Sequence, residues 1–112
     1  MAATFVGLGT TTIAVPGTPQ RLSIPASVSP TNVHALLLQV LSSNVGKVYI
    51  GTAGLNKSTL AAVLAVLPAP SGSVLPVFTT AMAQAANALP LGSLWVDADN
   101  GGDGILGSVI VA

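Results

Sequence analysis

The chain contains very little charge. Only three basic and three acidic residues occur among its 112 residues, and the formal net charge is zero. Ordinary soluble domains have about a quarter of their residues charged. The surface must therefore be unusually neutral. Because neither mutual repulsion nor a hydrated charged shell keeps copies apart, we expect the protein to associate.

Cysteine is absent as well. This absence excludes a disulfide framework and a thiolate metal site, so the fold must depend on packing or on partners. A chain of 112 residues can bury something over about 60% of its unfolded surface, which is enough for one core. We therefore expect one β domain over residues 1–112.

Long hydrophobic runs are also lacking, although hydrophobic residues make up 51% of the chain. The two strongest runs, at residues 33–41 and 60–67, are well short of the roughly 20 residues that a membrane-spanning helix needs. The first residues lack the basic and apolar regions of a signal peptide. Three cations are too few for a surface that follows phosphates. Neither a membrane nor a nucleic acid is expected as a partner.

Turn residues divide the chain into short apolar pieces at the spacing of an antiparallel β-sandwich or a jelly-roll-like barrel. Strands are predicted at residues 10–15, 20–24, 33–40, 47–51, 94–97 and 105–111. Residues 33–40 and 47–51 are expected to form one hairpin, and residues 94–97 and 105–111 a second one. Pro25 closes the second strand or places it at a sheet edge. The predicted fold class is all-β.

Two segments give conflicting signals. Residues 57–67 are rich in alanine and leucine, which favour a helix, but Pro68 and Pro70 end such a helix after about three turns. The β-branched residues fit a buried strand with a bulge, and a strand is the preferred interpretation. At residues 81–88 the propensity indicates a helix, whereas an all-β setting favours a strand or a loop. Both alternatives stay open there.

The segment 97–103 carries three carboxylates, at Asp97, Asp99 and Asp103. Their spacing resembles the start of a calcium loop, in which hard oxygen ligands converge. The helical form of that motif fails, because Gly101 stands at its fifth position and Ser108 at its twelfth, where a bidentate glutamate is needed. We favour a glycine-rich hairpin turn with solvated carboxylates. The alternative is a calcium site in a β-turn.

Catalytic groups are scarce. A triad would need the single histidine, His34, with a serine and an aspartate, and no nucleophile-elbow pattern accompanies them. We therefore expect no enzymatic activity and no cofactor, with His34 hydrogen-bonded to the backbone in a strand. Tyr49 and Trp95 lie within apolar strands, which favours a place in the core or an interface over a sugar-binding platform. Arg21 is expected to be solvated or to pair with the 97–103 loop.

Three segments resemble those of small virion proteins from tailed phages. They are Gly46-Lys47-Val48-Tyr49-Ile50-Gly51, the proline-rich link around Pro68-Ala69-Pro70, and Leu94-Trp95-Val96-Asp97-Ala98-Asp99 with Gly102-Asp103-Gly104 and a closing apolar strand. The similarity spans residues 10–112. It implies a short, mainly β structural protein of the phage particle, a group that includes decoration or cement proteins on the capsid surface.

We accordingly predict a structural virion protein of a bacteriophage, of the capsid decoration or cement type. Its partners would be other copies of itself, with a homotrimer expected by analogy, and the major capsid protein. Apolar strand faces and the nearly uncharged residues 2–12 are the expected contacts, and residues 1–12 are a candidate N-terminal arm. The rival hypotheses are a tail, fibre or baseplate component and a small glycan- or calcium-binding β module.

Overall fold

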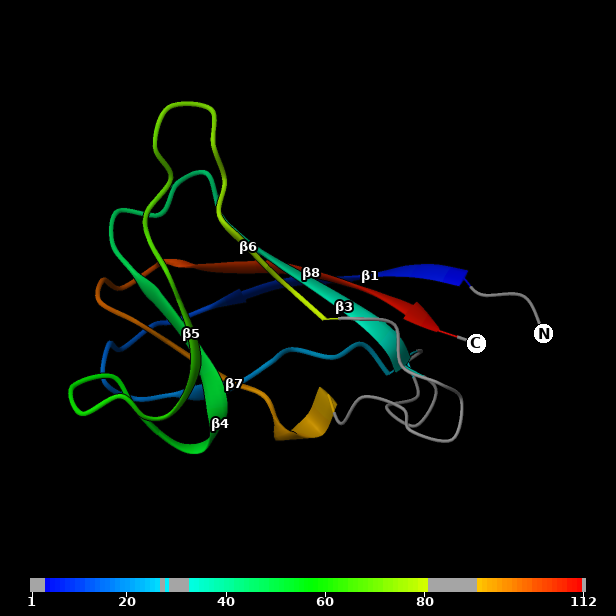
Figure 1. Ribbon diagram of the computed structural model, residues 1–112, viewed down its shortest axis with the longest axis horizontal. Helices are drawn as coiled ribbons and strands as arrows, with labels where there is room; N and C mark the ends of the chain where they lie inside the picture. Colours follow the sequence, from blue (N-terminus) through cyan, green and yellow to red (C-terminus); the bar gives the residue numbers. More distant parts are fainter. Residues whose placement is uncertain (1–3, 27, 29–32, 81–90, 112) are drawn as a thin grey trace.

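The computed structural model describes residues 4–26, 28, 33–80 and 91–111, which form two antiparallel sheets packed face to face (Figure 1). The strands are β1 (Thr4–Thr12), β2 (Gln20–Arg21), β3 (Val33–Val40), β4 (Val48–Asn56), β5 (Ala61–Leu67), β6 (Val77–Thr79), β7 (Trp95–Ala98) and β8 (Gly104–Val111), and a 3-10 turn, η2 (Leu91–Ser93), precedes β7. The prediction of an all-β fold is confirmed.

The two sheets have the strand order of a jelly roll. Sheet A has the order β1-β8-β3-β6, and sheet B has the order β2-β7-β4-β5. The chain therefore passes from one sheet to the other at each connection between successive strands except the one between β4 and β5. Two four-stranded sheets linked in this way are the double-sheet architecture of jelly rolls.

Both predicted hairpins are wrong. Strand β3 lies in sheet A and β4 in sheet B, and β7 and β8 are separated in the same way. Each connection is an arch between sheets, because β3 pairs with β8 and β6 while β4 pairs with β5 and β7. A strand–turn–strand pattern looks the same in a hairpin and in an arch. Whether a hairpin or an arch forms depends on partner strands that are distant in the sequence.

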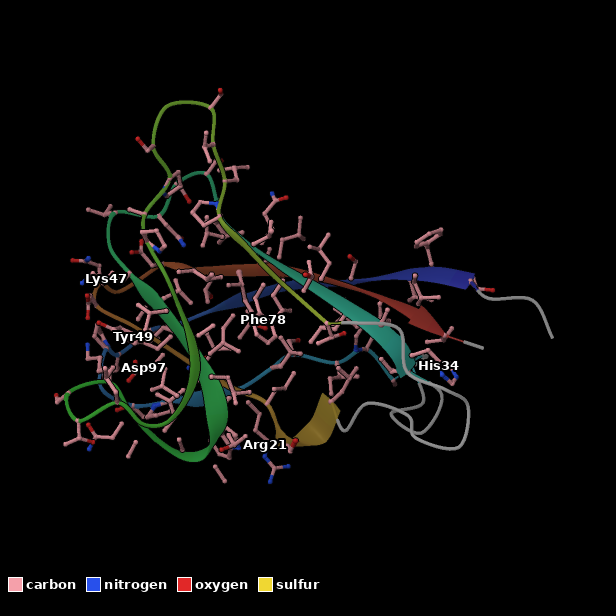
Figure 2. The ribbon with its side chains drawn as sticks, viewed as in Figure 1. Arg21, His34, Lys47, Tyr49, Phe78 and Asp97 are labelled. Carbon is pink, nitrogen blue, oxygen red and sulfur yellow. The ribbon has the colours of Figure 1, made fainter. Side chains whose placement is uncertain are left out.

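The core lies between the sheets and is filled by alternate residues of both. Its fully buried side chains include Leu38, Ile50, Val96 and Ile105. Strand β3 is mostly buried, as predicted, because Leu36, Leu38 and Val40 alternate into this core. Phe78 of β6 packs against the same cluster and lies between the sheets in Figure 2.

Strand β1 is shifted relative to the strand predicted at 10–15. It begins at Thr4 and pairs with β8 of the same chain, with a bulge between Gly7 and Gly9. Gly9 has a φ of 78°, and the bulge places Leu8 over Gly107 of β8, which has no side chain. The sequence did not predict the first part of this strand, because Gly7 and Gly9 have low strand propensity. Whether the candidate arm also reaches a neighbouring copy stays a prediction.

Strand β5 confirms the preference for a strand over a helix, but it is not buried. It forms an edge of sheet B, and only Leu67 at its end is buried. The expected bulge is present, because Ile50 pairs with Ala65 and the next residue, Gly51, pairs with Val63, and Ala62 has a φ of 57°. An apolar composition cannot show which strand will lie at an edge. Residues 81–88 lie outside the described residues.

Strand β2 confirms a further expectation. It is the other edge of sheet B and ends well before Pro25. Its extent is shorter than the predicted 20–24, since the amide of Leu22 still bonds to Leu94 O but that of Ser23 turns to the Thr11 hydroxyl.

Candidate functional site

The outer face of sheet A carries no full charge. None of its four strands contains an aspartate, glutamate, lysine or arginine. Cross-strand register places the outward residues in three rows. The rows are Phe5–Ile110–Ala35, Gly7–Ser108–Leu37–Thr79 and Thr10–Leu106–Gln39–Val77.

Large apolar side chains remain open to solvent on this face. Phe5 is 83% exposed, and Leu37, Val77 and Leu106 are also exposed. A hollow of about 240 Å³ lies over the first two rows, and its lining includes Phe5 and Leu37. Contiguous exposed apolar patches on a soluble protein commonly mark an interaction site. We name this surface the A face.

Most of the charged residues lie on the side of sheet B. Two belong to its strands, Arg21 on β2 and Asp97 on β7, and two follow its strands, Lys57 after β4 and Asp99 after β7. The other two, Lys47 and Asp103, lie in the arches β3–β4 and β7–β8.

Asp103, in the β7–β8 arch, is hydrogen-bonded to the β3–β4 arch. Its carboxylate accepts hydrogen bonds from the amides of Val45 and Gly46, at 2.8 to 3.1 Å. Asn44 adds a reciprocal pair with Gly104, because its Nδ2 donates to Gly104 O and its Oδ1 accepts from Gly104 N. Asp103 and Asn44 are both buried. These bonds give hydrogen-bond partners to the two buried polar side chains.

Asp97 is buried on the outer side of sheet B. Its Oδ1 accepts hydrogen bonds from Gly17 N at 3.0 Å and from Ala98 N at 2.7 Å, so it ties the 13–19 loop to β7. The interpretation of the 97–103 segment as a turn with solvated carboxylates is therefore wrong for Asp97 and Asp103. Backbone amides donate hydrogen bonds to these two carboxylates in place of water. The sequence could not predict these bonds, because some of the amides belong to residues up to 80 positions away.

Asp99 is the exposed carboxylate of the three, and it belongs to a small polar cluster. Tyr49 Oη donates to its two oxygens at 3.1 and 3.3 Å. Lys57 Nζ lies 3.5 Å from Asp99 Oδ1 and donates to Ala98 O at 2.8 Å. Burial, the hydrogen bond to Asp99 and the charges of Asp99 and Asp97 raise the pKa of Tyr49 above its ordinary value of 10.0.

The three carboxylates therefore have separate protein partners. Among the residues that the structure describes, no group of three or more histidines, aspartates or glutamates could hold a metal ion. The calcium candidate at Asp97, Asp99 and Asp103 thus gains no support from the geometry.

Arg21 and Trp95 form a stacked pair. The guanidinium carbon lies 5.4 Å from the centre of the indole ring, within the range of a cation–π interaction. It is Lys57 and not Arg21 that pairs with the acidic segment. Since Arg21 lies over Trp95, this ring is not an open platform for a sugar.

His34 is buried in β3, as expected for a strand residue. Figure 2 shows His34 and Asp97 towards opposite ends of the long axis of the molecule. The structure therefore does not bring these two residues into a common site.

Sequence reasoning named apolar strand faces as contacts but did not single out the A face. The signal was present, because the segments 4–12, 33–40, 77–79 and 104–111 contain no full charge. What was missing was the knowledge that these four segments share one sheet.

Fold and site together define an all-β protein of jelly-roll topology with one charge-free sheet face. No family model, curated protein or solved structure matches the chain. Within the described part of the chain, no helix has the length and hydropathy to span a membrane.

Proposed function

We propose that this protein is a structural, non-enzymatic subunit of a bacteriophage particle, of the capsid decoration or cement type. The observation that carries the proposal is the A face. Charged residues are depleted at the centres of protein interfaces, because a charge buried there without a partner is costly. The A face can be covered without leaving any charge unpaired.

Two further observations support the proposal. The chain resembles small tailed-phage virion proteins in its 46–51 and 94–104 segments. The jelly-roll architecture is used by viral capsid domains, although lectins and cupins share it, so that the fold by itself does not decide the function. The charge-free face favours assembly over ligand binding within this set.

The mechanism follows from mass action. A protein that binds the assembled shell and not its free subunits stabilises the shell in proportion to its binding free energy. The proposed partner is the major capsid protein, contacted through Leu37, Leu106 and Val77 on the A face. Because the contact is apolar, its affinity should change little with salt.

Localisation tests the proposal. Particles of the phage whose genome encodes this protein are purified on a gradient and labelled with gold-conjugated antibody against the protein. We expect the protein to sediment with the particles and the gold to decorate their heads. Gold on tails or baseplates would support the tail, fibre or baseplate hypothesis instead. Absence of the protein from purified particles would reject the proposal.

A thermal assay tests the calcium-binding form of the remaining hypothesis, a small β module. We expect the melting temperature of the purified protein to be the same in millimolar calcium chloride and in chelator, because Asp97, Asp99 and Asp103 bond to protein donors. A melting temperature raised by calcium would indicate a calcium-binding β module.

A further inference from the structure

The two sheets end in four edge strands, and three of these carry features that discourage pairing with another chain. Strand β2 has only two residues, one of which is Arg21. Strand β6 has three residues and follows Pro76. Strand β5 has a positive φ at Ala62 and is followed by Pro68. Short length, charge, proline and local distortion all prevent a regular ladder.

The fourth edge, β1, lacks most of these features. It has nine residues, none of them charged and none of them proline. One side of β1 pairs with β8, and β1 is the outermost strand of sheet A. Its bulge between Gly7 and Gly9 leaves two regular stretches, 4–7 and 9–12. A long, neutral edge strand presents unpaired amides and carbonyls that another strand can join.

We propose that β1 pairs antiparallel with β1 of a second copy across a two-fold axis, so that the two A sheets become one sheet of eight strands. The occupant is a second copy because its β1 offers an edge of the same length and the same absence of charge, as a two-fold interface requires. In this arrangement the two A faces are continuous. The part that this joined surface plays in docking rests on the proposed function.

The area of the A face bears on how the joined surface would dock, and not on the β1 contact itself. The four strands have 28 residues in all, and at about 3.4 Å per residue and a strand spacing of about 4.8 Å they cover about 460 Å². A standard stable interface buries about 800 Å² on each partner. One A face is therefore smaller than a stable contact needs, whereas two joined faces of about 900 Å² exceed that requirement.

An antiparallel β1 pair is a dimer. It differs from the trimer that the resemblance to decoration proteins implies, so a mass measurement separates the two. Light scattering across a dilution series should give the mass of a dimer that dissociates on dilution. A trimer, or a monomer at every concentration, would overturn the proposal.

Spin labels locate the contact. The chain has no cysteine, so the single-cysteine variants Phe5→Cys, Gly7→Cys, Thr10→Cys and Thr12→Cys each accept one label. All four positions are exposed, and a side chain at Gly7 meets no other atom. Two residues span about 6.7 Å along a strand, and the same label in the second copy moves equally far in the opposite direction. On one side of the two-fold axis, the distance between equivalent labels should therefore change by about 13 Å for every two residues along β1.

Control labels at Leu64 and Val66 test the other long edge. Both residues are exposed on β5, and these labels should stay far from their equivalents in the second copy. Equal distances at all four β1 positions, or close approach of the β5 labels, would contradict β1 pairing. A monomer that decorates phage heads would overturn this inference and leave the proposed function intact, whereas a β1 dimer absent from particles would do the reverse.

Discussion

The outer faces of the two sheets differ in charge although they present apolar residues of similar exposure. Leu37 on the A face is 38% exposed and Val66 on the outer face of sheet B is 39% exposed. The A face carries none of the six full charges, whereas Arg21, Lys57, Asp97 and Asp99 lie on the side of sheet B. The low charge of the chain is therefore unevenly distributed.

Five of the six charged side chains have partners within the described part of the chain. Asp97 and Asp103 accept backbone amides, Asp99 accepts from Tyr49 and pairs with Lys57, and Arg21 stacks on Trp95. Their positions are explained by the fold. The A face has no such groups, and its lack of charge is what the proposed apolar contact with a partner requires.

The largest expected effect concerns the arch that joins the two sheets. Asp103→Ala removes the buried carboxylate that accepts hydrogen bonds from the amides of Val45 and Gly46. We expect the free energy of unfolding, measured by urea denaturation, to fall by about 3 kcal/mol. The exposed Asp99 provides the control, and Asp99→Ala should lower it by less than about 1 kcal/mol. Equal losses would show that the arch bonds do not hold the sheets together.

The next prediction compares the two faces directly. Leu37→Lys should weaken binding to purified phage particles by at least about tenfold, because it places an unpaired charge in the contact. Val66→Lys, at matched exposure on sheet B, should change binding less than about twofold. Both variants should keep their stability within about 0.5 kcal/mol, since the positions are on the surface. Similar losses of binding in both variants would argue against the A face as the contact.

The polar cluster on sheet B should affect stability and not binding. Tyr49→Phe removes the hydrogen bond to Asp99, and we expect a loss of about 1 kcal/mol in urea denaturation at neutral pH.

Tyr49 also makes a pH-dependent contribution. The folded state raises the pKa of Tyr49, so its contribution is fully present below the unfolded value of 10.0 and is lost as the pH rises through the folded pKa. Unfolding free energies measured on both sides of pH 10.0 should therefore show a decline that is smaller in Tyr49→Phe. The same alkaline decline in both proteins would assign it to other groups.

The smallest effect is expected at the stacked pair. Arg21→Ala should lower the free energy of unfolding by about 0.5 kcal/mol, because an exposed cation–π pair contributes little. The fluorescence of Trp95 should change with the loss of the guanidinium. Arg21→Lys keeps the charge and is the matched control, and an unchanged spectrum in Arg21→Ala would contradict the stacking.

Local pattern predicted several strands well. Residues 33–40 and 105–111 were recognised because both segments are mostly apolar and are bounded by turn residues, and both lie in the middle of sheet A. The strand at 4–12 was displaced because Gly7 and Gly9 have low strand propensity. The role of Asp103 could not be predicted, since its carboxylate oxygens accept hydrogen bonds from amides 57 and 58 positions away.

The sequence by itself determined the neutral composition, the all-β class and the absence of charge from four of the strand segments. These are properties of single residues and short periods, and they do not depend on distant contacts. Tertiary structure alone decided that those four segments form one sheet, that the expected hairpins are arches, and that β1 is a long edge. The reason is that strand pairing depends on which partners bury both sheets at once, and this depends on the whole chain.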